Sequence, residues 1–384
     1  MDICKSAKCT GCGACVDACP KSCISFRYDE NGFYRSYVDE DRCIQCRRCV
    51  KVCPANHPYK THRIQQAYKA RRQDKQAAVN SSSGGIASVL SEYIVKNGGV
   101  VAGCGFDDTL CLKHTLASTL DELEPFKGSK YLQSNTVGIY RQVREQLQAD
   151  KTVLFIGTPC QVSALQTYLG KTYDKLYSVD FVCHGVSSRC IFDKYLAFTD
   201  PTTAPLSVSF RNKTRGYRNK KACFEMQVVY PDRTVRNSTE SGLYYWFASS
   251  LSVRESCYRC PFVSFERASD ITLADYIGDD LDDTDNEVGV NTLFVNSAKG
   301  KALAEAVRQE IVLEPKPVED TAKRFNRLMY PSSMPTCRKE FFDRLQTDDY
   351  PTLEATFDAQ KILPGKMVRR WQAMKRRLRK LFVG

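Results

Sequence analysis

Residues 9–20 read CTGCGACVDACP, and residues 43–54 repeat the pattern as CIQCRRCVKVCP. In both blocks three cysteines follow at steps of three residues, and a fourth stands four residues later, directly before a proline. In two-cluster ferredoxins the first three cysteines of a block bind one iron-sulfur cubane, while the fourth reaches the other cluster. The repeat therefore predicts an α+β, ferredoxin-like N-terminal domain over residues 1–60 with two [4Fe-4S] clusters.

The spacing also assigns four ligands to each cluster. Cluster one takes Cys9, Cys12, Cys15 and Cys53, and cluster two takes Cys43, Cys46, Cys49 and Cys19. A pair of zinc sites is the competing interpretation, but zinc generally uses two separated Cys-x2-Cys pairs and not four cysteines followed by proline. Cys4 and Cys23 fall outside the pattern, and we assign them to packing.

The composition is that of a folded protein with two or three domains. The chain has 384 residues, of which 19 are cysteines and 42% are hydrophobic, and its formal net charge is +12. This apolar content excludes wholesale disorder, and the length allows more than one core. No apolar run approaches the roughly 18 residues that span a bilayer, and the first residues lack a signal-peptide pattern. We therefore expect a cytoplasmic protein, whose clustered cysteines stay reduced and bind metal.

Short apolar runs alternate with helical patterns after the cysteine blocks. We expect helices over 86–95, 139–149 and 161–169, and strands over 100–102, 153–156 and 176–182. This alternation is typical of an α/β domain. Residues 206–236 are richer in strand formers and turn residues, which predicts an antiparallel insertion. The polar stretch 61–79 is interpreted as a linker, so the α/β domain extends over 80–347.

Four further cysteines stand far apart in the sequence. Cys160 and Cys183 follow the ends of two expected strands, whereas Cys257 and Cys260 form a later Cys-x2-Cys pair. Because the carboxyl ends of strands converge at one edge of an α/β sheet, Cys160 and Cys183 are expected to be neighbours in space. Four thiolates suit one more cluster or a zinc ion. A reactive thiol at Cys160, a redox-active Cys257/Cys260 pair or buried thiols without a chemical role remain as alternatives.

The segment NSSSGG at 80–85 directly precedes the first expected helix of the α/β domain. Small hydroxyl residues and glycines at a helix start expose backbone amides and the positive end of the helix dipole, which suits a phosphate. A plain helix cap with a flexible loop is the competing interpretation. The sequence has neither a Walker motif nor a GxGxxG motif, so nothing supports a nicotinamide dinucleotide site.

Six motifs follow one another along the chain: SSSGG (81–85), GSKYLQS (128–134), GTPCQ (157–161), DFVCHG (180–185), CYRCPF (257–262) and DITLADYIG (270–278). In this order they resemble the coenzyme F420 hydrogenase/dehydrogenase beta-subunit family, in its bacterial form with an N-terminal two-cluster ferredoxin domain. The resemblance implies that the α/β domain binds FAD, with FMN as the alternative, beside a third [4Fe-4S] cluster. It implies that Cys160, Cys183, Cys257 and Cys260 are the cluster ligands. It also implies a flavin site at Ser82, Ser83, Gly84, Gly85, Gly128, Ser129 and Lys130.

The resemblance implies an activity as well. A flavin takes two electrons as a hydride and releases them singly, whereas each cluster carries one electron. We therefore expect a flavin-dependent iron-sulfur oxidoreductase that acts on a small molecule, with polysaccharide biosynthesis as one setting. The alternative is an electron-transfer subunit that feeds a separate catalytic partner. No catalytic residue is assigned, because structural roles are at least as plausible for His184, Asp270 and Asp275, which lie in matching motifs.

The positive charge is concentrated near the end of the chain. Residues 366–381 read KMVRRWQAMKRRLRKL, with eight Lys or Arg and no acid, and apolar residues recur every three or four positions. This pattern predicts a basic amphipathic helix within a C-terminal extension at 348–384. Such a helix suits an anionic membrane surface, which would place the protein peripherally on the inner face of the membrane. A solvated tail is the alternative, and nucleic acid is a less favoured partner.

Overall fold

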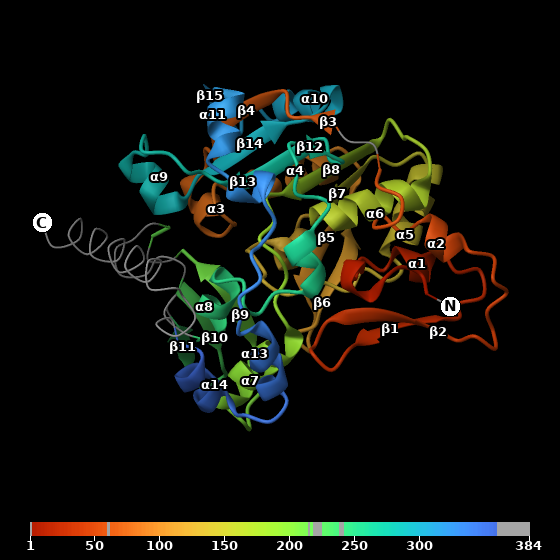
Figure 1. Ribbon diagram of the computed structural model, residues 1–384. Helices are drawn as coiled ribbons and strands as arrows, with labels where there is room; N and C mark the ends of the chain where they lie inside the picture. Colours follow the sequence, from red (N-terminus) through yellow and green to blue (C-terminus); the bar gives the residue numbers. More distant parts are fainter. Residues whose placement is uncertain (1, 60–61, 214–215, 218–224, 238–241, 359–384) are drawn as a thin grey trace, which may run out of the picture.

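The computed structural model describes residues 2–59, 62–213, 216–217, 225–237 and 242–358. A small N-terminal module lies against a larger mixed α/β body, and Figure 1 shows the module in red at the right. The basic segment at 366–381, which the sequence predicts to be an amphipathic helix, lies outside the described residues.

The N-terminal module repeats one local structure at each cysteine block. Helix α1 (Ala14–Asp17) lies in the first block and α2 (Arg48–Lys51) in the second, and a hairpin of β1 (Ile24–Tyr28) and β2 (Tyr34–Val38) connects them. The residue before each helix is left-handed, with φ 74° at Gly13 and 56° at Arg47. The chain therefore turns at the same place in both repeats, which gives the ferredoxin-type module that the cysteine spacing predicts.

An eight-stranded sheet forms the centre of the body, with strand order β15-β4-β14-β13-β8-β7-β5-β6. These strands are β4 (Gln66–Arg72), β5 (Val100–Phe106), β6 (Leu112–Ala117), β7 (Val153–Ile156), β8 (Leu176–Phe181), β13 (Ile271–Asp275), β14 (Asn291–Val295) and β15 (Ile311–Lys316). Neighbours β5, β7, β8 and β13 pair in parallel, whereas β6, β14 and β15 pair antiparallel with their neighbours. The parallel strands bring their carboxyl ends to one edge, where cofactors bind in such sheets.

Helices cover both faces of this sheet. On one face lie α4 (Ile86–Lys96) and α10 (Ala298–Ala306), and on the other lie α5 (Ile139–Gln148) and α6 (Pro159–Leu169). Side chains alternate along the strands: Val101 packs in the core under α4, while Val100 and Ala102 pack in the core under α5 and α6. The three helices and three strands that the sequence predicts are all confirmed within a few residues.

The polar stretch at 61–79 is not a linker. It contains β4, which pairs with both β14 and β15, and then α3 (Lys75–Val79). Basic residues hide this strand in the sequence, but Lys69 and Arg71 lie 2.6 and 3.0 Å from the buried carboxylate of Asp285. Asp285, which is distant in the sequence, therefore neutralises the positive charges that made this segment resemble a solvated linker.

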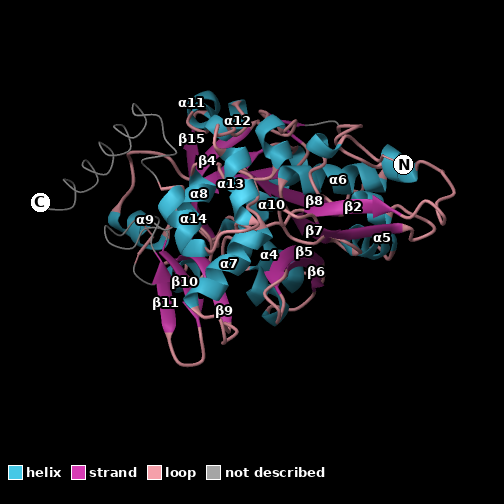
Figure 2. Ribbon diagram, turned by 60° about the horizontal axis from the view of Figure 1, so that its bottom comes forward, coloured by secondary structure: helices cyan, strands magenta, loops and turns pink. Residues whose placement is uncertain are grey.

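The stretch predicted as an antiparallel insertion forms the three-stranded antiparallel sheet β9 (Ser207–Asn212), β10 (Glu225–Val229) and β11 (Thr234–Asn237). Figure 2 shows this sheet beside four helices, α7 (Arg189–Thr199), α8 (Gly242–Ala248), α13 (Arg338–Leu345) and α14 (Tyr350–Thr356). The fully buried Trp246 lies at their centre, and its ring nitrogen donates to the Phe357 carbonyl at 2.9 Å. The predicted extension from 348 therefore does not stand apart, because Tyr350 and Leu353 complete this core.

The remaining elements are short. They are η1 (Ser6–Lys8), β3 (His62–Arg63), η2 (Asp121–Phe126), η3 (Glu255–Arg259), β12 (Glu266–Arg267), α9 (Asp283–Val288), α11 (Val318–Lys323) and α12 (Asn326–Met329). Across the described ranges, every helix is too short or too polar to cross a membrane.

Candidate metal centre

The ligands assigned to cluster two surround one hollow at the surface of the module. Cys19, Cys43, Cys46 and Cys49 all line it. Cys49 is buried whereas Cys46 is exposed, so this hollow opens toward solvent. Cys23, which spacing assigned to packing, also lines it, and its sulfur lies 3.3 Å from that of Cys19.

The ligands assigned to cluster one lie deeper. Cys12 and Cys53 are buried. Burial raises the pKa of the Cys15 thiol to about 12, and the charges of Cys9 and Cys53 act in the same direction, so these groups share one interior region. Cys4 belongs to it as well, since its thiol interacts with the thiols of Cys53 and Cys9.

The four distant cysteines line a single cavity in the body. Cys160, Cys183, Cys257 and Cys260 form part of its wall, together with Thr10 of the module. Cys160 is the second residue of α6, which follows β7, and Cys183 follows β8, the parallel neighbour of β7. Adjacent strands therefore deliver two of the cysteines to the same edge of the sheet, and the η3 turn supplies the other two.

Burial raises the pKa of the cavity thiols, to about 11 at Cys257 and to about 12 at Cys260. A metal binds the thiolate form, so metal binding would release protons from such thiols. Among the described residues, no three Cys, His, Asp or Glu side chains are already arranged to hold a single metal ion. The cysteines assigned to cluster two line one hollow, and the four distant cysteines line another.

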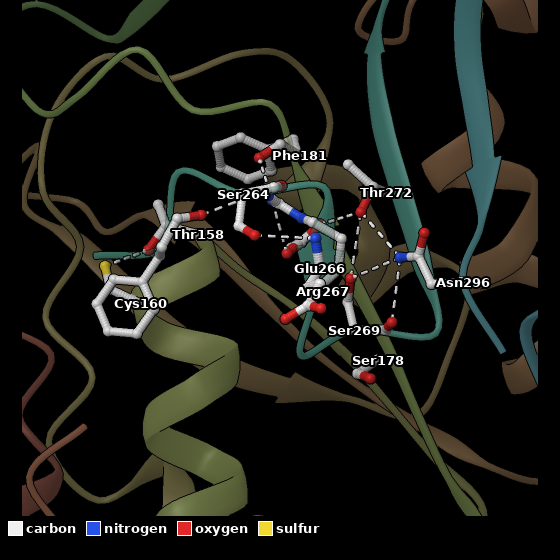
Figure 3. A network of polar contacts seen from close by, with 12 residues as sticks. Thr158, Cys160, Ser178, Phe181, Ser264, Glu266, Arg267, Ser269, Thr272 and Asn296 are labelled. Carbon is white, nitrogen blue, oxygen red and sulfur yellow. Dashed lines mark hydrogen bonds and ion pairs between the residues drawn. The ribbon is translucent and has the colours of Figure 1, made fainter. Parts of the chain in front are cut away.

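A buried ion pair fixes the segment that carries Cys260. Arg267 in β12 lies 2.8 Å from Asp180 in β8, and their side chains are 2% and 0% exposed. Arg267 also donates to the Phe262 carbonyl at 3.2 Å, while Thr272 donates to Asp180 at 2.6 Å. Figure 3 shows Arg267 in this network, with Cys160 at the start of the neighbouring helix. The pair thus joins the Cys257/Cys260 loop to the strand that precedes Cys183.

The module is attached to the body beside this cavity. Gln133 lines the cavity and donates from its amide nitrogen to the Thr10 and Gly11 carbonyls, both at 2.8 Å. Thr136 and Tyr140 both donate to the Cys12 carbonyl at 2.6 Å. The loop with the first cysteines of cluster one is therefore held against the wall of the four-cysteine cavity.

The two segments that the resemblance assigns to the flavin lie side by side. Ser129 donates to Ser82 at 3.2 Å, at the amino-terminal end of α4. Ser83 donates to the Val290 carbonyl at 2.6 Å, and a Cβ on Gly84 would lie 2.6 Å from the Ala70 carbonyl. These two residues position the loop, whereas Ser82 and Ser129 remain partly exposed and accessible to a ligand.

Lys130 and its neighbour Gly128 close the η2 turn. The Lys130 ammonium donates to the carbonyls of Phe126, Lys127 and Gly128 at 3.0, 2.8 and 3.1 Å, and burial lowers its pKa to about 8. Gly85 has φ 78° and precedes the first residue of α4. Lys130 thus stabilises the end of the η2 turn.

Sequence reasoning missed a polar and aromatic patch beside this loop. Arg211 donates to both carboxylate oxygens of Asp275, at 3.1 and 2.8 Å, where β13 ends. Tyr131 stacks on Phe247 and meets Tyr244 edge-on. Arg211 lies in the antiparallel insertion, so no local spacing relates it to the sheet edge.

The other motif residues considered as proton donors have structural partners. Asp270 accepts from the Ser178 amide and hydroxyl, both at 2.9 Å, and from the Ser297 hydroxyl. The His184 ring lies 3.0 Å from the Phe247 carbonyl, and burial lowers its pKa to about 4. Neither group is arranged as a free acid or base.

Comparison with known families agrees with this architecture. The sequence model for the C terminus of the coenzyme F420 hydrogenase/dehydrogenase beta subunit matches residues 150–321, which include all four cavity cysteines. Two models of a 4Fe-4S dicluster domain match residues 8–57 and 35–83. The chain therefore contains, over residues 150–321, the C-terminal region of the coenzyme F420 hydrogenase/dehydrogenase beta subunit. An N-terminal iron-sulfur module of the ferredoxin type precedes this region.

Individual relatives of the chain are similar to it over short stretches. An uncharacterized ferredoxin of Methanocaldococcus jannaschii is 47% identical over 49 residues, which are 13% of this chain and 62% of that protein. The acetyl-CoA decarbonylase/synthase subunit alpha 1 of Methanosarcina acetivorans is 42% identical over 57 residues, 14% of this chain and 7% of the relative. The 7Fe ferredoxin of Hydrogenibacillus schlegelii is 33% identical over 57 residues, 15% of this chain and 67% of the ferredoxin. The chain thus spans less than two thirds of the first two of these relatives.

A solved structure of the F420-reducing [NiFe] hydrogenase complex from Methanosarcina barkeri contains a similar chain. The identity is 19% and the TM-score is 0.46, over 79% of this chain and 97% of that one.

Proposed function

We propose that the protein is a flavin-dependent iron-sulfur oxidoreductase that moves electrons between the clusters of its module and a small molecule at the flavin. The observation that carries the proposal is the cavity lined by four distant cysteines and by Thr10 of the module. The positions of these four cysteines in the sequence do not by themselves require their side chains to meet. Their convergence beside the cluster-one loop supports a third [4Fe-4S] cluster in electron-transfer contact with the first two.

The order of the centres follows from their burial. Cys46 of cluster two is exposed, which favours this end of the module as the place where a one-electron carrier docks. Cluster one is buried against the body, and its loop borders the four-cysteine cavity. We therefore propose the sequence cluster two, cluster one, inner cluster and flavin, in either direction of flow.

The residues at the start of α4 fit the phosphate groups of a flavin. Two partly exposed hydroxyls, Ser82 and Ser129, lie at the positive end of an 11-residue helix. The proposed flavin-binding set is Ser82, Ser83, Gly84, Gly85, Gly128, Ser129 and Lys130, with Ser83 and Gly84 holding the loop in shape. FAD has two phosphates for this site and FMN one. When bound, the flavin would exchange a hydride with substrate and single electrons with the cluster.

The substrate class rests on the family resemblance. Many bacterial members are encoded with polysaccharide-synthesis enzymes, so we propose a sugar nucleotide or a lipid-linked sugar intermediate. The protein would act in the cytoplasm, and its basic segment at 366–381 would bind an anionic membrane surface, where lipid-linked substrates reside.

A second function is supported by the apolar side chains near the cavity. Phe181 ends β8, while Tyr330 and Met334 flank the cavity residue Ser332, and these three large side chains are 39%, 65% and 47% exposed. Exposed apolar groups next to a redox centre suit a protein partner. In this alternative the chain is an electron-transfer subunit that feeds a separate catalytic subunit.

Anaerobic purification with analysis of flavin, iron and zinc tests the proposal. We expect one flavin per chain, and a one-electron dye that reduces the clusters should also bleach the flavin absorbance. Substituting Cys183 and Cys257 with serine should slow this bleaching but leave the flavin bound. A chain without flavin would contradict the flavin chemistry, and stoichiometric zinc with little iron would contradict the whole redox assignment.

A further inference from the structure

Arg254 is a buried arginine without an acidic partner. Its side chain is 1% exposed, and it forms no ion pair within the part of the chain that the structure describes. Its Nε donates to the Cys9 carbonyl at 2.8 Å, and Nη2 lies 3.6 Å from the Cys9 sulfur. Its Nη1 donates to the Gln133 side-chain oxygen at 3.0 Å. A guanidinium in this position needs an anion nearby, because burying an unpaired charge is costly.

The backbone of Arg254 belongs to the other cysteine site. Its amide donates to the carbonyl of Val186, a cavity residue, and its carbonyl accepts from the Cys257 amide, both at 3.0 Å. The side chain thus leaves the η3 turn that carries Cys257 and reaches Cys9 in the module. The guanidinium therefore lies between the Cys9 loop of the module and Gln133, which lines the four-cysteine cavity.

A four-iron cluster with four thiolate ligands is an anion, and its reduction adds a further negative charge. A fixed positive charge next to it favours the reduced form, and a hydrogen bond to a ligand sulfur acts in the same sense. Arg254 is placed to do this for two centres at once. Its partners Cys9 and Gln133 belong to cluster one and to the cavity wall, respectively.

We propose that Arg254 is a shared positioning residue for cluster one and the inner cluster, raising the reduction potentials of both and fixing their separation. This inference rests on the third cluster of the proposed function. Such a bridge makes electron transfer between module and body depend on one side chain. Cluster two, at the exposed end of the module, lies outside its reach.

Two other arginines provide matched controls. Arg35 donates to the Ser6 carbonyl at 2.7 Å, pairs with Asp29 at 2.9 Å, and its charge interacts with that of Cys9, so it acts on cluster one. Arg327 lines the cavity, and its charge interacts with Cys183 and Cys257, so it acts on the inner cluster. The three arginines therefore separate an effect on one centre from an effect on both.

Redox titration of the anaerobic full-length holoprotein, followed by electron paramagnetic resonance, tests the role of Arg254. R254Q should lower the potentials of two clusters and leave that of cluster two unchanged, whereas R35Q and R327Q should each lower the potential of one. R254K keeps the charge but not the fork of hydrogen bonds, and it should shift the same two potentials by less. Electron transfer from the module to the inner cluster should slow at least tenfold in R254Q.

Several outcomes would overturn the inference. Unchanged potentials in R254Q, or a shift of a single cluster, would show that Arg254 is not shared. If R254Q loses iron, the same titration is carried out on R254K. Unchanged potentials in R254K would then contradict the proposal. If the wild-type protein has three clusters, a failed prediction for R254Q contradicts this inference alone. If the wild-type protein has only two clusters, both this inference and the proposed function are contradicted.

Discussion

The two groups of cysteines in this molecule are assembled in opposite ways. In the module, eight proposed ligands lie within residues 9–53, and each block wraps around its cluster through a short helix and a left-handed residue. In the body, four cysteines between 160 and 260 meet because β7 and β8 are neighbours and because η3 docks on them. The first arrangement depends on local backbone geometry and the second on the register of a whole sheet. Damage to the sheet should therefore abolish the inner site and spare the module.

The largest expected effect comes from the ion pair that fixes the Cys260 segment. D180N removes one partner of the buried pair with Arg267, which is expected to cost about 3–5 kcal/mol of unfolding free energy. We expect this variant to lose the inner cluster and to keep the two module clusters. Chemical denaturation and iron analysis measure both effects. D343N is the control, because its exposed pair with Lys339 should contribute less than about 0.5 kcal/mol. Equal stability losses in the two variants would contradict the role of the buried pair, and loss of the module clusters together with the inner cluster in D180N would remove the distinction between the regions.

A second prediction concerns acid. Burial lowers the pKa of His114 to about 4, and the ring lies between the Ile156 carbonyl and the Ser134 hydroxyl. The unfolded chain binds a proton on this histidine near pH 6.5 and the folded chain does not. Stability of the body should therefore fall as the pH drops from about 6.5 to 4, by up to about 3 kcal/mol. Thermal unfolding across this range should show a weaker pH dependence in H114Q, and an identical dependence would contradict the assignment.

These cases show what the sequence could predict and what it could not. The cluster motifs, and helices such as 86–96, depend on spacing within a few turns of chain, so they are readable from the residues alone. Strand β4 could not be predicted in this way, because Lys69 and Arg71 are typical of a solvated segment. Their acidic partner, Asp285, lies more than 200 residues away in the sequence. Arg254 was missed for the same reason. It stands three residues before Cys257, and only the docking of module on body gives it Cys9 as a partner.

The contact between the two regions gives a third prediction. Gly11 has φ 64°, and a Cβ there would lie 2.4 Å from the Gln133 amide nitrogen. G11A should lower stability by about 2–4 kcal/mol and increase hydrogen exchange at the module-body contact. Gly98 has φ 75° but no atom within 4 Å of such a Cβ, so G98A isolates the backbone cost of about 1–2 kcal/mol. A G11A variant no less stable than G98A would argue against a tight contact.

The smallest effect on the redox body is expected from the basic end of the chain. Deleting residues 366–384 removes the segment with eight Lys or Arg. The truncated protein should keep its iron and lose its binding to anionic liposomes, while neutral liposomes serve as the control. Unchanged binding to anionic liposomes would contradict the membrane proposal without affecting the comparison between the two cysteine groups.

The central claim is that Cys160, Cys183, Cys257 and Cys260 hold a third cluster. Iron per chain, measured on anaerobically purified wild-type protein and on the C183S/C257S double variant, tests it most directly. The account predicts about twelve irons in the wild type and about eight in the variant, with the spectrum of the module clusters unchanged. About eight irons in both proteins would contradict it.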